Sequence, residues 1–176
     1  MNIEWRKIKE ERYKAGFRKM IRRTYELPTG EIANYDIVES GPAVCVLPVT
    51  SEGKILVIKV FRPGPDKVLM ELPGGFNDEG LTPEEAIKKE LLEETGYTGN
   101  FKLVGKTYED AYWTMYRHHF IATGCEKVQE PNQEYDEKGS EIVLLSVEEF
   151  KKHLKSGELT DPETGYMGLL ELNYLP

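Results

Sequence analysis

The stretch from Thr82 to Gly96 carries signals for both ends of a helix, and any fold of this chain has to accommodate that helix. Thr82 is a suitable N-cap, Pro83 suits the first helical position, and Glu85 completes a capping box three residues after Thr82. Gly96 suits the end of the helix because glycine readily adopts a left-handed backbone conformation. We therefore expect a helix that runs from Pro83 through Glu94 and stops near Gly96.

Apolar, β-branched runs on both sides of this helix predict strands. Before the helix, "AVCVLPVT" and "KILVIKVF" are joined by a Ser-Glu-Gly turn, the best hairpin signal of the chain, and "VLMELPGG" ends in a Pro-Gly-Gly break. After the helix, "FKLVGKTYE", "RHHFIATGC" and "EIVLLSV" predict three more strands, and helices are expected over "VEEFKKHLKSG" and "TGYMGLLELNYL". Because strands and helices do not alternate regularly, we expect an α/β (α+β) fold in which a mixed β-sheet lies between helices.

The length and composition are those of one soluble globular domain. The 176 residues are 39% hydrophobic and 31% charged, which is ordinary for such proteins. We expect a single domain over residues 1–176, with an N-terminal arm over 1–40 and a core over 41–176. No apolar run approaches the roughly 20 residues that span a bilayer, and Cys45 and Cys125 are too few for a disulfide framework. A cytoplasmic location without a membrane partner is the default expectation.

The charge is unevenly distributed along the chain. The formal net charge is -8, yet the first 23 residues are rich in Lys and Arg, so the remainder is strongly acidic. An acidic body argues against nucleic-acid binding by bulk electrostatics. The basic arm, "WRKIKEERYKAGFRKMIRR", leaves a phosphate or RNA contact open, but its interspersed glutamates favour a solvated element. We expect no nucleic-acid partner.

Three glutamates of the predicted helix lie at the edge of its buried stripe. At about 100° per residue, Glu93 and Glu94 fall within about 60° of Glu90 on a helical wheel, interleaved with the apolar Ala86 and Ile87. Like charges four residues apart destabilise a helix, and a divalent cation would relieve that repulsion. Carboxylate oxygens suit Mg²⁺ or Mn²⁺ rather than zinc.

A helix without a metal is the alternative, and the spacing alone leaves both interpretations open. In that case lysine–glutamate pairs four residues apart would stabilise a solvated helix face, namely Glu84–Lys88, Glu85–Lys89 and Lys89–Glu93.

The stretch from Gly75 to Tyr97, "GFNDEGLTPEEAIKKELLEETGY", closely resembles the Nudix box of the Nudix hydrolases. That motif reads Gly, five residues, Glu, seven residues, then Arg-Glu-apolar-any-Glu-Glu-any-Gly-apolar. Two positions depart from it, because Leu81 stands where the motif has Glu and Lys89 where it has Arg. In the family these two side chains help to hold the loop–helix–loop, so the departures indicate loss of a structural pair more than loss of metal ligands. The matching residues are Gly75, Glu90, Leu91, Glu93, Glu94, Gly96 and Tyr97.

The segment before the box, "FRPGPDKVLMELPGG", is similar to the corresponding segment of ADP-ribose pyrophosphatases. This resemblance implies that Arg62 contacts a substrate phosphate or ribose and that Glu71 supports the substrate or metal shell. It also implies that the Gly74 carbonyl is a metal ligand, together with Glu90, Glu93 and Glu94. Arg62 as a surface ion-pair partner and Glu71 as a structural brace remain open. The family often has a Pro-Gly loop where this chain has "YEDAYWTMYRHH", which weakens the assignment of ADP-ribose in particular.

The resemblance implies a Nudix fold with an N-terminal antiparallel strand arm and a Mg²⁺-dependent pyrophosphohydrolase, with Mn²⁺ as a possible substitute. Its substrate would be a nucleoside diphosphate linked to another moiety, most simply ADP-ribose or a related nucleotide sugar. Glu94 and Glu90 are the expected principal metal ligands. In similar enzymes a loop glutamate before the last strand activates water, and Glu137 or Glu141 in "EPNQEYDEKGSEIVLL" would take that role. An acidic loop without a catalytic part remains open.

Two further expectations concern partners. Trp113 could stack on a nucleobase, although aromatic residues in such positions are more often core or interface residues. Similar pyrophosphatases pair through N-terminal strands, so a homodimer is expected. The alternative function is a nucleotide-binding module that has kept the fold and lost turnover, which the departures at Leu81 and Lys89 favour.

Overall fold

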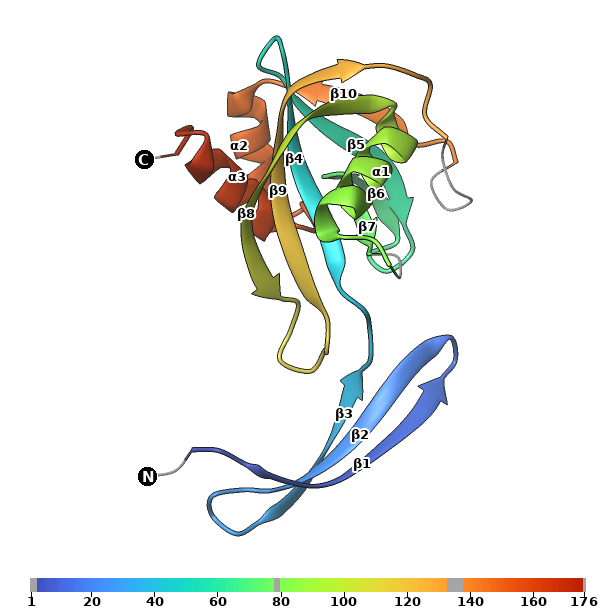
Figure 1. The fold of residues 1–176 in the computed structure, drawn as a ribbon, viewed down its shortest axis with the longest axis vertical. Coiled ribbons are helices and arrows are strands. Elements are labelled where there is room, and N and C mark those ends of the chain that lie inside the picture. Colours follow the sequence, from blue (N-terminus) through green and yellow to red (C-terminus); the bar gives the residue numbers. More distant parts are fainter. Residues whose placement is uncertain (1–2, 78–79, 133–137, 176) are drawn as a thin grey trace. The chain divides into compact units, whose positions relative to one another are not determined.

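The computed structural model of the protein describes residues 3–77, 80–132 and 138–175 (Figure 1). The chain divides into two compact units, each of which is described by itself. Unit 1 comprises residues 1–42 and 108–116, and unit 2 comprises residues 43–107 and 117–176. The expected division into an arm over 1–40 and a core over 41–176 of a single domain stays a prediction.

Unit 1 is built on a three-stranded antiparallel sheet in the order β1-β2-β3. Its strands are β1 (Arg6–Ala15), β2 (Arg18–Glu26) and β3 (Ile32–Val38). The turn between β1 and β2 contains Gly16, whose φ of 63° lies in the left-handed region that glycine tolerates. Residues 112–114 extend the sheet beside the end of β3, because Val38 N donates to Tyr112 O and Thr114 N donates to Val38 O. The expected antiparallel N-terminal strands are therefore confirmed.

Unit 2 contains a seven-stranded mixed sheet in the order β10-β5-β4-β9-β8, with β6 beside β5 and β7 beside β4 (Figure 1). The parallel pair is β4 with β9, and the other pairs recorded within this sheet are antiparallel. The strands are β4 (Ala43–Thr50), β5 (Ile55–Arg62), β6 (Lys67–Glu71), β7 (Gly74–Phe76), β8 (Tyr97–Tyr108), β9 (Tyr116–Lys127) and β10 (Glu141–Leu145).

The predicted hairpin of β4 and β5 forms only at its turn. These strands pair at Val49 and Ile55, and then β4 continues between β9 and β7. Every residue of β4 is buried, which explains why its side chains are apolar on both faces. The predicted Pro-Gly-Gly break was partly wrong, because Gly74–Phe76 forms the short strand β7.

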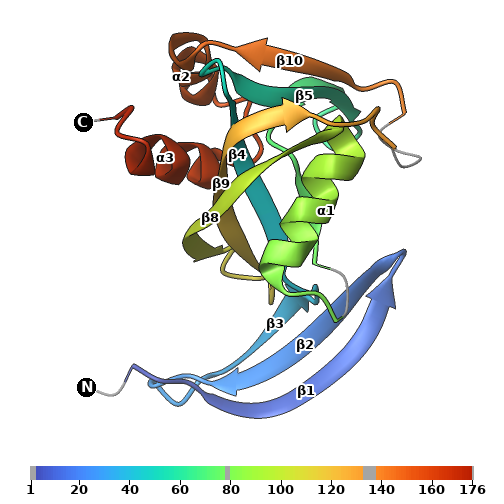
Figure 2. The same cartoon turned by 45° about the horizontal axis from the view of Figure 1, so that its top comes forward.

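In the described part of the chain, three helices cover the two faces of this sheet, which confirms the mixed sheet between helices. Helix α1 (Pro83–Thr95) lies on one face, and α2 (Val147–Ser156) and α3 (Pro162–Glu171) lie on the other (Figures 1 and 2). The predicted cap is present, since Glu85 N donates to Thr82 Oγ1 and Thr82 N donates to the Glu85 carboxylate. Gly96 ends α1 with a φ of 77°. Helix α3 begins earlier than expected, at Pro162, and ends at Glu171.

Separate apolar clusters lie on the two sides of the sheet. The α1 side includes Val44, Val46, Ile87, Leu91 and Phe120. The side of α2 and α3 includes Leu47, Val57, Ile121, Phe150 and Leu169. Helix α1 is therefore seated on a close-packed sheet, which limits how far its side chains can shift.

Some polar and sulfur-containing side chains are also buried in unit 2. Cys45 and Cys125 are free thiols and are buried. His153 of α2 is buried, and its Nε2 lies 2.7 Å from Met70 O. Helix α2 is amphipathic, and His153 falls on its inner side with Phe150 and Leu154. Among the helices of the described residues, none is both long enough and apolar enough to cross a membrane.

Candidate active site

The carboxylate of Glu94 is held in the core of unit 2 beside β7. Its side chain comes from the inner face of α1, its residue is only 5% exposed, and its Oε2 accepts a hydrogen bond from Gly74 N at 3.0 Å. Glu84 and Lys88 lie on the exposed side of the same helix. The helical wheel placed Glu94 at the edge of the buried stripe rather than opposite it, and in the structure Glu94 is itself buried.

Two glycines at the start of β7 allow a close approach of Glu90 of α1 and of strand β4. A Cβ atom on Gly75 would lie 2.8 Å from Glu90 Oε1 and 3.0 Å from Glu90 Oε2, so the Glu90 carboxylate occupies the space that a side chain would need. A Cβ atom on Gly74 would lie 2.3 Å from the backbone oxygen of Val44 in β4. Gly74 is thus required by the close approach of a neighbouring strand, whereas Gly75 leaves the space that the Glu90 carboxylate fills.

The third carboxylate, Glu93, lies at the rim of this arrangement. It is partly exposed, and Lys89 Nζ lies 3.7 Å from its Oε2. Lys88 also pairs with Glu84, so two of the lysine–glutamate pairs expected on a solvated helix are present. The Glu84–Lys88 pair and the buried carboxylate of Glu94 lie on different sides of α1, whereas Glu93 is both an ion-pair partner and a candidate ligand.

The donor atoms on α1 and β7 fit a hard divalent cation in their chemistry. Glu90, Glu93 and Glu94 are carboxylates, and Gly74 adds a backbone carbonyl in the adjoining strand. Such all-oxygen sets suit Mg²⁺, which binds through few carboxylates and keeps several waters. Within the described ranges no three His, Cys, Asp or Glu side chains are gathered closely enough to form a complete cluster by themselves. The structural observation that supports a metal site here is that the Glu90 carboxylate fills the space left by the missing side chain of Gly75.

Arg62 and Glu71 form an ion pair at the ends of β5 and β6. Arg62 Nε donates to Glu71 Oε2 at 2.7 Å, and Glu71 is 5% exposed. Glu71 is paired with Ile58 in the antiparallel register, so both side chains lie on one face of the sheet. Ile58 packs with Leu56, Val60 and the partly buried Tyr97, which directly follows α1. The structure therefore directs Glu71 toward the same face that carries α1.

The chain after β9 is bonded to the carboxyl end of α1, which the sequence did not predict. Val128 N donates to Gly96 O at 2.9 Å, and Asn132 N donates to Glu93 O at 2.7 Å. A Cβ on Gly96 would lie 2.1 Å from Gln129 O, so the glycine is required for this approach as well as for its positive φ. Backbone bonds between segments more than 30 residues apart leave no local signal in a sequence.

The two candidate loop glutamates are placed differently. Glu137 lies outside the described residues. Glu141 begins β10, is paired in register with Lys59, and its Oε2 lies 3.1 Å from Lys59 Nζ. Because Lys59 alternates with Ile58 along β5, the Lys59–Glu141 pair lies on the face of the sheet opposite to Glu71. The structure thus does not bring Glu141 together with the α1 carboxylates.

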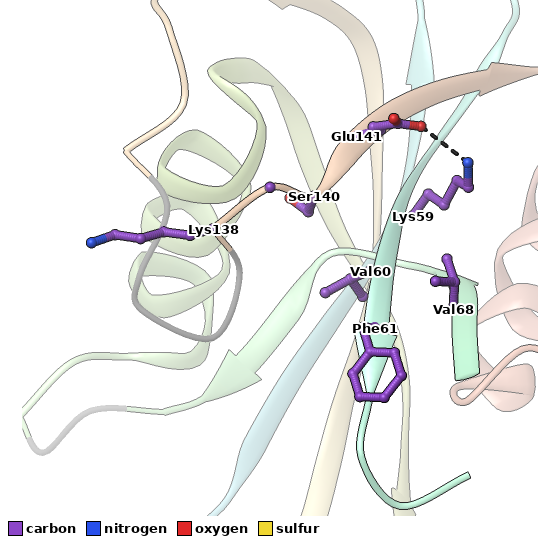
Figure 3. Close-up of a pocket in the computed structure, with 8 residues that line it drawn as sticks. Lys59, Val60, Phe61, Val68, Lys138, Ser140 and Glu141 are labelled. Carbon is purple, nitrogen blue, oxygen red and sulfur yellow. Dashed lines mark hydrogen bonds and ion pairs between the residues drawn. The ribbon is translucent and has the colours of Figure 1, made fainter. Parts of the chain in front are cut away.

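Lys59 and Glu141 border a hollow of about 230 Å³ beside β5, shown in Figure 3. Phe61 and Val68 contribute apolar side chains, and residues 138–140 form the opposite wall. In Figure 3, Phe61 and Lys59 extend from the same strand, while Glu141 reaches toward Lys59 from β10. The hollow thus lies at the start of β10, where residues 138–140 lead into the strand beside β5.

Trp113, the candidate for base stacking, belongs to unit 1. The guanidinium carbon of Arg18 lies 5.5 Å from the centroid of its ring, so a cation already occupies one face of the indole. The neighbouring Tyr112 stacks on Tyr35 with ring centroids 6.2 Å apart. Arg62, Glu71, Gly74 and the α1 carboxylates all belong to unit 2. The role of Trp113 stays a prediction.

The chain is similar to several known proteins. The NUDIX domain family matches residues 39–163. The chain is 32% identical over 143 residues to the ADP-ribose pyrophosphatase of Bacillus subtilis (strain 168), covering 80% of this chain and 77% of that protein. It is 36% identical over 92 residues to the ADP-sugar pyrophosphatase of Mus musculus, covering 46% of this chain and 42% of that protein.

A solved structure described as an ADP compounds hydrolase has the same fold. It superimposes with a TM-score of 0.83 and 15% sequence identity, covering 98% of this chain and 94% of that chain. At this identity the likeness concerns the fold.

Proposed function

Since this chain belongs to the Nudix hydrolase family, we propose that it cleaves ADP-ribose or a related nucleotide sugar to a nucleoside monophosphate and a phosphorylated sugar. The observation that carries the proposal is the placement of Glu94 and Glu90 against Gly74 and Gly75. The Bacillus subtilis and mouse relatives are named for ADP-ribose and ADP-sugars, which supports this class of substrate.

In the proposed reaction, Glu90, Glu93, Glu94 and the Gly74 carbonyl would hold Mg²⁺, or Mn²⁺ as a substitute. When bound, the metal neutralises charge on the diphosphate oxygens and lowers the pKa of coordinated water. The buried carboxylate of Glu94 is fixed by Gly74 N, and that of Glu90 is confined by the backbone at Gly75. These residues thus keep their ligand atoms in place before the substrate arrives, which lowers the reorganisation that the reaction requires.

Arg62 is the proposed residue for binding the diphosphate. Its guanidinium is oriented by the bond from its Nε to Glu71 Oε2 at 2.7 Å. A planar guanidinium is suited to recognise phosphate through several donors. We assign Arg62 and Glu71 together to substrate binding.

The water that attacks the diphosphate needs a group that accepts its proton. Glu137 is our first candidate and Glu141 the second. The ion pair of Glu141 with Lys59 supports Glu137 over Glu141. Separate Glu137→Gln and Glu141→Gln variants test the choice, and full turnover in both would exclude both residues.

The proposal is tested by incubating the wild type and the Glu94→Gln variant with Mg²⁺ and a panel of nucleotides. The panel contains ADP-ribose, GDP-mannose, NADH and diadenosine polyphosphates, and products are identified by ion-exchange chromatography. Glu84→Gln is the matched control, because Glu84 lies on the exposed side of the same helix. We expect a nucleoside monophosphate from the wild type and Glu84→Gln, and at least about a hundredfold less from Glu94→Gln. Unchanged turnover in Glu94→Gln would contradict the assignment of the metal ligands.

A nucleotide-binding module without turnover is the second candidate. Leu81 and Lys89 replace the charged pair of the family motif, and Lys89 is instead close to Glu93. Nucleotide binding without any metal-dependent product would favour this candidate. In that case the double variant Leu81→Glu, Lys89→Arg should restore turnover.

We also propose that the protein is a cytoplasmic homodimer that pairs through unit 1, with no nucleic-acid or membrane partner, and that Trp113 contributes to base binding. Unit 1 exposes several large apolar side chains, namely Ile3, Trp5, Ile8, Phe17 and Ile32. Exposed apolar side chains of this size supply the contacts that a protein interface buries, which supports pairing through unit 1. Light scattering at micromolar concentration tests the dimer, and a monomer mass would exclude it. A Trp113→Ala variant with unchanged nucleotide affinity would exclude the base contact.

A further inference from the structure

Glu71 has a buried carboxylate oxygen that receives no hydrogen bond from the described part of the chain. Its Oε2 accepts from Arg62 Nε at 2.7 Å, whereas its Oε1 is buried and has no donor there. A buried acceptor without a donor is destabilising, more so when it carries charge, and native proteins seldom keep one without a purpose. The position of Oε1 therefore suits a hydrogen-bond donor that arrives with a ligand.

The location of Glu71 indicates which ligand could supply that donor. Glu71 lies on the α1 face of the sheet, as its register with Ile58 shows, and only Leu72 and Pro73 separate it from Gly74. It also holds Arg62, the proposed diphosphate-binding residue. A donor that reaches Oε1 thus belongs to the part of the substrate that is attached to the diphosphate.

The chemistry of the attached group decides whether it can satisfy Oε1. A sugar offers hydroxyl groups, which donate hydrogen bonds to a carboxylate. A further phosphate, as in a nucleoside triphosphate, offers only acceptor oxygens and negative charge at working pH, so it is repelled by the Glu71 carboxylate. A site built to bond a substrate hydroxyl rejects analogues that lack it, because its own polar group is then left unpaired.

We propose that Glu71 Oε1 accepts a hydrogen bond from a hydroxyl of the sugar attached to the diphosphate, and that this contact selects nucleotide sugars over nucleoside triphosphates. The inference rests on the proposed function and adds a residue that determines specificity. Glu71 thus has two contacts, since one oxygen orients Arg62 and the other reads the substrate.

The test compares two ligands that differ in the hydroxyl groups and not in charge. One is ADP-ribose and the other is the β-methyl ester of ADP, each with a methylene group in place of the bridging oxygen so that the diphosphate is not cleaved. Their affinities are measured by calorimetry with Mg²⁺ for the wild type, Glu71→Gln, Glu71→Met and Glu158→Gln. Glu158 is the matched control because it pairs with Lys67 at the other end of β6, on the surface.

We expect the wild type and Glu158→Gln to prefer the ADP-ribose analogue by about tenfold. The preference should fall to about threefold in Glu71→Gln, because a neutral hydrogen bond is roughly half as strong as a charge-assisted one. It should vanish in Glu71→Met, which has no polar atom at that place. The preference is a ratio of two affinities, so a variant that is only partly folded still reports it.

The possible outcomes separate the two proposals. A wild-type preference that is unchanged in Glu71→Gln and Glu71→Met would overturn the inference and leave the proposed function intact. Failure of the wild type to bind either ligand would overturn both. A tighter affinity of Glu71→Gln than of the wild type for the methylene analogue of ATP would support the predicted repulsion of a third phosphate.

Discussion

The two units of the molecule differ in how they use their side chains. In unit 2 the central strand β4 is buried at every residue, and apolar clusters lie on both sides of the sheet. In unit 1 all but one residue of β1 are exposed, and the buried apolar residues of the described chain there are Ile21, Ile37 and Met115. Unit 2 also buries polar groups such as His119 and Glu94, whereas the Arg22–Asp36 pair of unit 1 is exposed.

This difference shows why the candidate site lies in unit 2. A ligand carboxylate keeps its position only if the surrounding atoms cannot move, and a close-packed core supplies that constraint. Unit 1 is instead stabilised by strand pairing and by an aromatic cluster of Trp5, Tyr25 and Tyr35, whose ring centroids lie 5.3–6.1 Å apart. Mutations should therefore act differently in the two units, and each expected difference can be measured.

The largest expected effect on stability is that of Phe150→Ala in unit 2. Phe150 of α2 is fully buried in the apolar cluster between the sheet and helices α2 and α3, so its removal leaves a cavity. We expect the free energy of unfolding to fall by about 3–5 kcal/mol in urea denaturation. Tyr35→Ala in unit 1 should cost distinctly less, because Tyr35 is only partly buried. Equal losses in the two variants would remove the contrast between the units.

The second prediction concerns His119, which is fully buried in unit 2. Its Nε2 lies 2.8 Å from Thr107 Oγ1 and its Nδ1 lies 2.6 Å from Thr164 Oγ1. Burial, helped by the charge of Arg117, lowers the pKa of His119 from 6.5 to about 4. Between pH 6.5 and about 4, His119 binds a proton in the unfolded chain but not in the folded chain, so the free energy of unfolding falls as the pH falls.

The contribution of His119 to stability is thus fully present above pH 6.5 and is lost as the pH falls toward 4. We expect the loss to reach about 3 kcal/mol. Urea unfolding at several pH values gives the slope of the free energy of unfolding against pH. The difference in this slope between the wild type and His119→Gln measures the contribution of His119. Parallel slopes in the two proteins would show that His119 does not titrate differently on unfolding.

The third prediction compares two glycines. Gly75→Ala should displace the Glu90 carboxylate, because the new Cβ would lie within 3.0 Å of it. Metal affinity should fall about 10–100-fold, with little change in stability because the end of a flexible side chain can move. Gly16→Ala in unit 1 meets no atom within 4 Å, but its φ of 63° is strained for alanine. It should destabilise by about 1 kcal/mol and leave metal affinity unchanged.

Metal titration followed by calorimetry, together with urea unfolding, measures both properties for each glycine variant. A loss of metal affinity in Gly16→Ala, or none in Gly75→Ala, would show that the space at Gly75 does not fix the position of the Glu90 carboxylate.

The smallest expected effect is that of Arg22→Gln in unit 1. The Arg22 guanidinium donates to both oxygens of Asp36 at 2.8 Å, and this bond lowers the pKa of the Asp36 carboxyl. The pair is solvent-exposed, and exposed pairs often contribute nothing measurable to stability. We expect no resolvable change in the midpoint of urea unfolding. A clear fall in this midpoint would show that the exposed Arg22–Asp36 pair stabilises unit 1.

Several features of this protein could be predicted from the sequence because their causes are local. Helix α1 begins where Thr82 and Glu85 bond each other's backbone and ends where Gly96 adopts a positive φ. These contacts lie within a few residues of one another, so the residues themselves carry the signal. The inward position of Glu94 followed from helical periodicity in the same way, and the motif from Gly75 to Tyr97 identified the family.

Other features were decided only by the tertiary structure. The parallel pairing of β4 with β9, the strand β7 and the bonds of residues 128–132 to α1 join segments far apart in the chain. The ion pair of Arg62 with Glu71 depends on the register of β5 with β6, as does the burial of Glu71 Oε1, which has no donor among the described residues. Register and burial arise from the packing of whole elements, and no short stretch of residues contains that information.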